Sequence, residues 1–307
     1  MKITIFIVIL CIASNIVFAS ANSDLTFNQL KQNSYNEQLL SLEKEKINIS
    51  FLDHINNGFT FGALGSSLSF ADDKYIEKGT IPGLTYSASG VFAKHFYTKL
   101  YLDYSFGNLK YDGALIDSKN STKNSRRNSV FNADINLGYT IPIYSSFQLI
   151  PYFGVGYRFW DRATDDDFFC INKATYQHYN AFLGIKLNWE LVSNKLFVSP
   201  HMQYGKIIYS NMKHDRKERE VELKGGGKTN IPGLLLDFNL GKESTYGLGV
   251  DLDYHLFDNF SLNTFINYTY FQYKQSDLQK GYYEPNSKTS ETKFGIALRY
   301  TWKNIDL

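Results

Sequence analysis

Apolar and polar residues alternate one by one through most of the chain, and this alternation restricts the fold more than any other feature of the sequence. Between Thr292 and Trp302, large apolar and aromatic residues occupy every second position, with Lys293 and Arg299 among the residues between them. A period of two is typical of a β-strand that is apolar on one face only, whereas an amphipathic helix has a period of 3.6. The same pattern recurs in 130–141, 176–191 and 245–256. An all-β fold is therefore predicted for residues 58–302.

The connections between the alternating segments differ in length in a regular way. Short turns lie near 94–96, 144–146, 193–195 and 258–259, and long polar connections lie near 72–81, 112–128, 161–175, 211–230 and 275–290. The segments themselves are about 12 residues long, and roughly 9 to 11 residues of a tilted strand cross a bilayer. Short turns at one end and long loops at the other are typical of transmembrane barrels. We therefore predict a closed antiparallel transmembrane β-barrel.

The number of strands depends on how segment 231–243 is interpreted. Its leucines and Phe238 could lengthen one strand or form an extra hairpin arm, so that eight to twelve strands are possible. Ten is the count that brings both ends of the barrel to the same side of the membrane, as single-chain bacterial barrels require. The ten predicted strands lie near 58–71, 82–94, 97–111, 129–143, 147–160, 176–192, 196–210, 244–256, 260–274 and 291–302.

The two ends of the chain differ from the barrel segment. Residues 1–21 combine Lys2, an apolar stretch and the motif Ala19-Ser20-Ala21, which together predict a cleaved secretory signal peptide. Residues 22–57 are rich in Asn, Gln, Lys and Glu and are predicted to be a periplasmic leader, in part helical. Residues 303–307 follow the last strand as a C-terminal extension. The mature chain would keep one of the two cysteines and form no internal disulfide.

Hydropathy and net charge argue against a helical membrane protein and against a nucleic-acid-binding protein. The mean hydropathy of −0.30 excludes a bundle of transmembrane helices. The net charge is only +2, from 32 basic and 30 acidic residues, which gives no reason to expect nucleic acid as a partner. No cofactor is expected. The protein is predicted to be a monomer.

Charged residues also fall at inward-facing positions of the predicted strands. Five acids and five bases share this placement. An ion-selective pore would carry an excess of one sign, whereas a balanced set indicates paired charges that fill a narrow interior. A plugged lumen and a small channel remain alternatives, because inward glycines such as Gly154, Gly156, Gly247 and Gly249 would leave room. The ten charged residues are Lys99, Asp103, Asp134, Arg158, Lys186, Glu190, Asp251, Asp253, Lys293 and Arg299.

Two patterns suggest chemistry that we weigh against simpler interpretations. Asp251, Asp253 and His255 alternate onto one face, as metal ligands could, but His255 would lie beside a periplasmic turn. A network of salt bridges in the lumen is the favoured interpretation, with no metal bound. For catalysis, the outer end of the third predicted strand offers only Asp112, with Asp117 further along. The outer end of the seventh offers the adjacent pair His214 and Asp215, which would point to opposite faces of a strand. No catalytic residues are therefore expected.

The last strand carries the most specific motif. It reads Lys293-x-Gly295-x-x-Leu298-x-Tyr300 and is followed by Trp302. This pattern resembles the C-terminal strand of Gram-negative outer-membrane β-barrels of the small OmpA-like and opacity-like kind. The resemblance implies an outer-membrane location, contact with membrane lipids and lipopolysaccharide, and recognition of Gly295, Leu298, Tyr300 and Trp302 by the barrel-assembly machinery. The family usually ends on the aromatic residue, whereas this chain continues for five residues.

Aromatic girdles at both membrane interfaces are a further feature of such barrels. Trp160 ends an ascending strand and is predicted to lie at the outer interface, and Trp189 and Trp302 are predicted to lie at the inner one.

The resemblance leaves the function open, since this architecture carries pores, adhesins, enzymes and inert anchors. A balanced lumen and long polar loops favour a non-enzymatic surface barrel, with a structural role or with loops that bind a host or surface ligand. A narrow, porin-like diffusion channel is the alternative. A rim protease of the omptin kind has the least support, because the paired acids of that family have no counterpart here.

Overall fold

The computed structural model describes residues 55–73, 75–113, 122–144, 146–163, 173–216, 218–222 and 228–302. The predicted signal peptide, residues 22–54 of the predicted leader and the extension 303–307 lie outside these residues. No helix in the described part of the chain is long and apolar enough to span a membrane.

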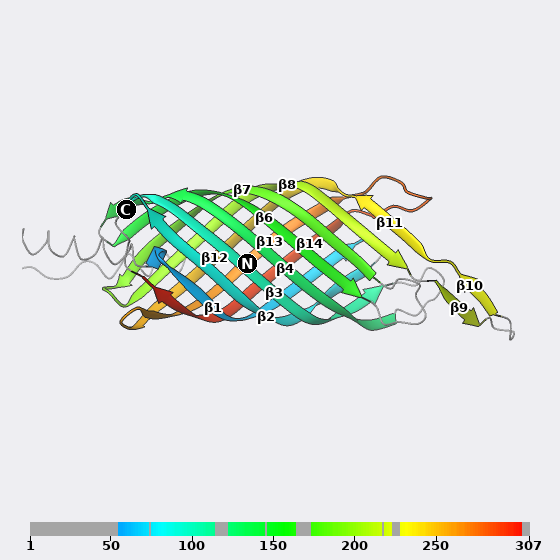
Figure 1. The fold of residues 1–307 in the computed structure, drawn as a ribbon, viewed down its shortest axis with the longest axis horizontal. Coiled ribbons are helices and arrows are strands. Elements are labelled where there is room, and N and C mark those ends of the chain that lie inside the picture. Colours follow the sequence, from blue (N-terminus) through cyan, green and yellow to red (C-terminus); the bar gives the residue numbers. More distant parts are fainter. Residues whose placement is uncertain are drawn as a thin grey trace, which may run out of the picture. The chain divides into compact units, whose positions relative to one another are not determined.

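Ten long strands form one closed antiparallel ring (Figure 1). Strand β14 pairs with β1 along its whole length, from Gly58 opposite Thr301 to Asp72 opposite Ser287, and this pairing closes the barrel. The predicted fold and the predicted count of ten are confirmed. In order around the ring, the strands are β1 (Gly58–Asp72), β2 (Tyr75–Phe92), β3 (Phe96–Gly113), β4 (Thr122–Tyr139), β6 (Phe147–Ala163), β7 (Lys173–Val192), β8 (Leu196–Arg216), β12 (Gly241–Phe257), β13 (Phe260–Lys274) and β14 (Ser287–Thr301).

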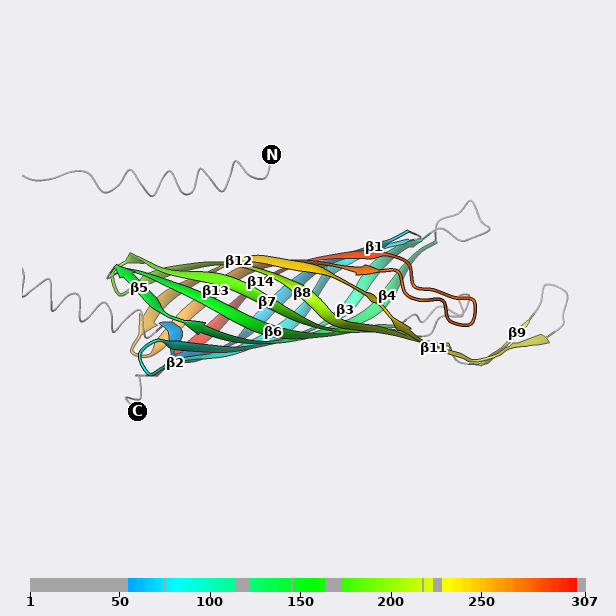
Figure 2. The same cartoon turned by 90° about the horizontal axis from the view of Figure 1, so that it is seen from above.

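Four short strands extend this ring. Strand β5 (Ile141–Tyr144) continues β4 and pairs with β6, and β11 (Leu234–Asn239) pairs with the outer end of β8 and leads into β12. Strands β9 (Arg219–Glu222) and β10 (Lys228–Ile231) form a separate hairpin, which extends with β11 beyond the end of the barrel (Figures 1 and 2). Most of the ambiguous segment 231–243 therefore lengthens an existing strand.

The strands are longer at their outer ends than the sequence pattern predicts. Strand β8 has 21 residues and β7 has 20. Segments 72–81 and 161–175 were expected to be polar loops, yet β2 already begins at Tyr75 and β6 continues to Ala163. Polar residues are compatible with strands there because the barrel wall continues beyond the apolar band that faces the lipid.

The outer surface of the barrel is apolar. Large apolar side chains with more than half of their surface exposed point away from the lumen on strands all around the ring. They include Phe61, Leu84, Ile135, Leu183, Leu248 and Ile296. In water such a surface would drive aggregation, whereas in a bilayer it contacts acyl chains.

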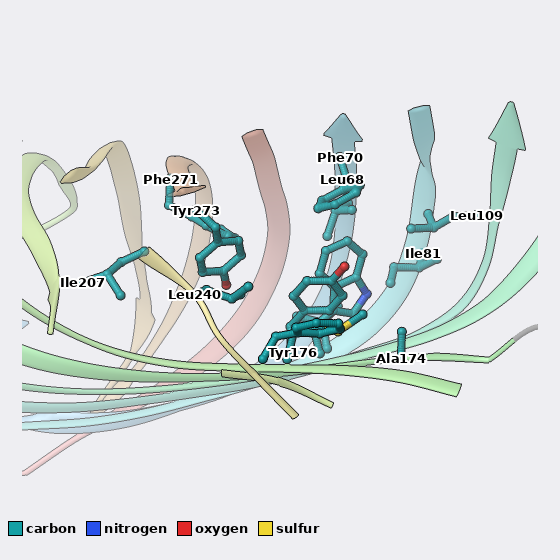
Figure 3. Close-up of a cluster of buried hydrophobic side chains, with 14 of the residues drawn as sticks. Leu68, Phe70, Ile81, Leu109, Ala174, Tyr176, Ile207, Leu240, Phe271 and Tyr273 are labelled. Atoms are coloured by element: carbon teal, nitrogen blue, oxygen red, sulfur yellow. The ribbon is translucent and has the colours of Figure 1, made fainter. Parts of the chain in front are cut away.

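The outer half of the lumen holds a cluster of buried apolar side chains, shown in Figure 3. We call this cluster the outer plug. The prediction that Trp160 lies in the outer girdle is wrong, since Trp160 is fully buried in this cluster and its Nε1 donates to Asn128 Oδ1 at 2.8 Å. On β6 it shares the inward face with Arg158 and Arg162. The outer plug consists of Leu68, Phe70, Ile81, Leu109, Val130, Trp160, Ala174, Tyr176, Ile207, Met212, Leu236, Phe238, Leu240, Phe271 and Tyr273.

Candidate functional site

The three residues that precede β1 lie inside the periplasmic mouth of the barrel. Ile55, Asn56 and Asn57 are all buried, and we call them the stopper. Asn56 donates to Gln148 Oε1 at 2.6 Å and accepts from Asn188 Nδ2 at 2.9 Å. The end of the predicted leader therefore lies inside the barrel.

Two further contacts fix the stopper. Asn57 Oδ1 accepts the backbone N–H of Val91 at 2.7 Å, and the carbonyl oxygen of Ile55 accepts from the guanidinium of Arg299. The side chain of Ile55 packs against Phe197. The stopper thus contacts strands on several sides of the ring.

Above the inner half, charged side chains meet across the lumen. Arg158 Nη1 donates to Glu291 Oε2 at 2.6 Å. Strands β6 and β14, which carry these residues, are five strands apart in either direction around the ring of ten. This ion pair therefore spans the lumen between opposite walls. We call this group the ion-pair layer.

The ion-pair layer includes further contacts. Lys293 Nζ lies 2.6 Å from Asp103 Oδ2 and 3.7 Å from Glu291 Oε2. Asn132 donates to Asp103 and accepts from Arg158, both at 2.8 Å. Three of the predicted lumen charges, Asp103, Arg158 and Lys293, are thus brought together. Glu291 was not predicted to lie in the lumen, although it has the same strand parity as Lys293.

A second buried ion pair lies within the outer plug. The guanidinium of Arg162 contacts Glu77, with Nε donating to Oε2 at 3.0 Å, and its Cζ atom lies 4.6 Å from the centre of the Phe70 ring. Asn128 Nδ2 donates to the other oxygen of Glu77 at 2.6 Å. Glu77 and Arg162 were not predicted to lie in the lumen, because both fall in segments that were expected to be loops. Continued alternation from Arg158 through Trp160 to Arg162 is the signal that could have found Arg162.

Between the stopper and the ion-pair layer lies a cavity of about 120 Å³, which we call the chamber. Four of the predicted lumen charges line it: Lys99, Asp134, Lys186 and Asp251. None of the ion pairs within 4 Å in the described part of the chain includes any of these four. Lys186 and Asp251 are each more than nine-tenths buried, yet neither has a hydrogen-bond partner among the described residues. The chamber walls therefore hold separated charges around open space.

The remaining predicted lumen charges lie at the periplasmic end. Arg299 Nε lies 3.0 Å from Asp253 Oδ1, and Asn263 donates to the same oxygen at 3.1 Å. Glu190 accepts the backbone N–H of Asn194 and so caps a periplasmic turn.

The inward glycines do not form a passage. A side chain at Gly154 would collide with Phe182 and Asn136, and one at Gly156 would collide with Asn180 and Asp134. Gly249 is filled in the same way by side chains of neighbouring strands. The room expected for a channel is thus largely taken up by larger residues on adjacent strands.

Within the described residues, no group of three or more His, Cys, Asp or Glu side chains is placed to hold a metal ion. On β8, His214 lies on the same face as buried Met212, and Asp215 is exposed on the opposite face. The side chain of Asp112 lies outside the described residues.

The predicted assembly-signal residues lie on β14 and directly after it. Leu298 faces outward, and the Tyr300 ring packs against Phe59 and Phe260 with centroids 5.5 and 5.3 Å apart. Gly295 faces the ring of Phe265, which a side chain at this position would strike. Trp302 and Trp189 lie near the periplasmic end, and Trp302 contacts the Phe59 ring at 6.3 Å.

At the extracellular end, β11 and residues 275–286 form a joined surface that we call the outer platform. The carboxamide of Gln279 bonds to both the N–H and the carbonyl of Asp237 on β11. Glu284 accepts from Tyr176 of the outer plug at 2.5 Å. The platform exposes Leu235, Leu278, Tyr282 and Tyr283.

Comparisons with known proteins were made by family, by sequence and by structure. No family model matches the chain, and no curated protein matches it. Among solved structures, the outer membrane protease OmpT from Escherichia coli is 10% identical, with 80% of this chain and 97% of that chain covered and a TM-score of 0.48. The outer membrane protein OprG from Pseudomonas aeruginosa is 10% identical, with 81% and 97% covered and a TM-score of 0.36.

A third solved structure is the transport unit of the autotransporter AIDA-I from Escherichia coli. It is 10% identical, with 80% of this chain and 90% of that chain covered and a TM-score of 0.41. These likenesses concern the fold alone. The closed ring, the apolar exterior and the short turns at one end make the protein a transmembrane β-barrel of the outer-membrane type, as predicted. Its location is the outer membrane, in contact with membrane lipids.

Proposed function

We propose that the protein is a non-enzymatic, non-conducting surface barrel that acts through its extracellular end. The observation that carries the proposal is the closure of the lumen at three levels, by the stopper, the ion-pair layer and the outer plug. Arg158 and Glu291 join opposite walls at 2.6 Å, and the outer plug is packed like the core of a water-soluble protein. A solute would have to displace all three levels to cross.

The outer platform supports the second half of the proposal. Leu235, Leu278 and Tyr282 each have at least half of their surface exposed beyond the barrel, on a surface fixed by Gln279 and Glu284. Exposed apolar and aromatic side chains on an ordered surface are typical of contact sites for other molecules. The partner in this proposal is a host or surface ligand.

Single-channel recording tests the closure. The barrel, purified from outer membranes, is inserted into a planar bilayer, with insertion confirmed by protease protection and a known porin as positive control. We expect a silent bilayer. The narrow channel would instead be established by steady, discrete openings of the wild type, provided that their ion selectivity changes in Arg158→Met.

Cell binding tests the outer platform. Bacteria that display the barrel are compared with bacteria that display Leu235→Asp/Tyr282→Asp, for adhesion to epithelial cells and to one another. We expect loss of adhesion in the variant, with Lys280→Ala as a matched control on the same surface. Equal adhesion of the two strains would contradict a role for the platform. If the wild type cleaves a dibasic peptide and His214→Ala does not, the protein is instead a rim protease.

The predicted recognition by the barrel-assembly machinery belongs to the same proposal. Gly295, Leu298 and Tyr300 lie in the periplasmic half of β14, where they pair with β1 and β13, and Leu298 faces the lipid. These positions are accessible to a membrane-bound factor before β14 pairs with β1.

A further inference from the structure

The chamber differs from the rest of the lumen because its charged groups do not touch one another. In the ion-pair layer, Lys293 and Asp103 lie 2.6 Å apart. In the chamber, none of the ion pairs within 4 Å among the described residues includes Lys186, and its Nζ atom lies 5.9 Å from the centre of the Tyr97 ring. Burial of charged groups without a partner is strongly unfavourable, so that such groups are expected to have a partner in the open space between them.

The charges of the chamber wall define the chemistry of that partner. Two of the four separated groups are ammonium groups, on Lys99 and Lys186, and two are carboxylates, on Asp134 and Asp251. A single anion would neutralise the lysines and repel the aspartates, and a single cation would do the reverse. A molecule that carries both charges can satisfy both pairs at once. Lys293 and Arg299 also line the chamber, but each already has an acidic partner.

The size of the chamber permits a small solute. One water needs about 10–15 Å³ of accessible volume, and the chamber has about 120 Å³. It therefore has room for several waters or for a small molecule such as an amino acid.

We propose that the chamber binds a small zwitterion of amino-acid type, with its carboxylate toward Lys99 and Lys186 and its ammonium group toward Asp251 and Asp134. Access is from the periplasmic side. The stopper forms the floor of the chamber through the contact of Ile55 with Arg299, which also lines the chamber. The ion-pair layer closes the opposite side, so that the chamber is a dead end and does not provide transport across the membrane.

The experiment measures binding of isotope-labelled glycine to the full barrel, extracted from outer membranes in detergent, by equilibrium dialysis. Acetate and methylammonium, each of which carries one of the two charges, are the comparison probes. We expect saturable binding of one glycine per barrel, and at least tenfold weaker binding of either comparison probe. The Asn56→Ala variant, which loses the contacts to Gln148 and Asn188, is expected to exchange glycine faster.

Two variants locate the site. Lys186→Met and Asp251→Asn are each expected to weaken glycine binding at least tenfold, since each loses one charge-assisted contact. Lys213→Met, an exposed lysine near the outer end of β8, is the matched control and should bind as the wild type does. Heat-modifiable migration on a gel shows whether each variant is folded.

Three results would overturn the proposal. One is absence of saturable glycine binding to the wild type and to Asn56→Ala, which would mean that the chamber holds only water. The second is acetate or methylammonium binding as tightly as glycine, which would indicate a site for a single charge. The third is unchanged binding in folded Lys186→Met and Asp251→Asn. The first two results need no variant of the chamber wall, so that the proposal can fail even where a variant does not fold.

Discussion

The outer and inner halves of the lumen are filled in opposite ways. In the outer half, Leu109 and Trp160 are fully buried among other apolar side chains, as they would be in the core of a soluble protein. In the inner half, Lys186 and Asp251 are almost as deeply buried but border open space. Both halves belong to the same ring of ten strands, so that the difference comes from the inward side chains alone.

This difference separates two tasks of the lumen. A close-packed apolar core is favourable by itself and needs no further occupant. Separated buried charges are unfavourable unless water or a solute lies between them. The outer plug therefore stabilises the barrel, and the chamber is the part whose energy depends on what it contains.

The largest expected effect comes from the ion-pair layer that separates the halves. Arg158→Met leaves the Glu291 carboxylate without its nearest cation, and we expect the free energy of unfolding to fall by about 3–5 kcal/mol. Urea unfolding in lipid vesicles measures this change. The double variant Arg158→Met/Glu291→Met should lose less than the two single variants together, because it removes both charges.

An exposed ion pair provides the control for this experiment. Lys213 and Asp237 lie 3.8 Å apart, and each is more than half exposed. Lys213→Met should change the free energy of unfolding by less than about 1 kcal/mol. Fully additive effects of Arg158→Met and Glu291→Met would mean that the two side chains do not interact in the folded barrel.

A smaller effect distinguishes the outer plug from the lipid-facing surface. Leu109 is fully buried, whereas Leu248 is 53% exposed on the outside of β12. Leu109→Ala should lower the free energy of unfolding by about 2–4 kcal/mol, because it leaves a cavity between packed side chains. Leu248→Ala should cost less than about 1 kcal/mol, since lipid chains can fill the space. Equal losses in urea unfolding would show that the outer plug is not close-packed.

The sequence predicts the barrel because the period of two directly reports which face of each strand is buried. It predicts the periplasmic ends of the strands well, as at Phe147 and Phe260, because tight turns end the alternation abruptly. The outer ends are missed because polar residues occur on both faces of the wall beyond the lipid and interrupt the alternation. Glu77 and Arg162 therefore look like loop residues, although they form a buried ion pair.

The candidate site is less predictable for a different reason. Strand parity places Arg158 and Lys186 inside the lumen, but it does not show which charge lies opposite on the far wall. The pairing of Arg158 with Glu291 depends on the number of strands and on their stagger. The separation of Lys186 from Asp251 depends on the same geometry, and so does the entry of Asn56 into the mouth of the barrel.

The smallest expected effect compares two tyrosines that are equally buried. Tyr273, in the outer plug, has its hydroxyl 2.5 Å from His178 Nδ1, whereas the hydroxyl of Tyr97, beside the chamber, has no hydrogen-bond partner among the described residues. Removal of a paired hydroxyl costs about 1 kcal/mol, and removal of an unpaired buried one costs nothing or is favourable. Tyr273→Phe should therefore destabilise the barrel in urea unfolding, while Tyr97→Phe should not. An equal loss of unfolding free energy in Tyr97→Phe would mean that a water molecule bonds to the Tyr97 hydroxyl in solution. This hydroxyl would then need no solute in the chamber as a partner.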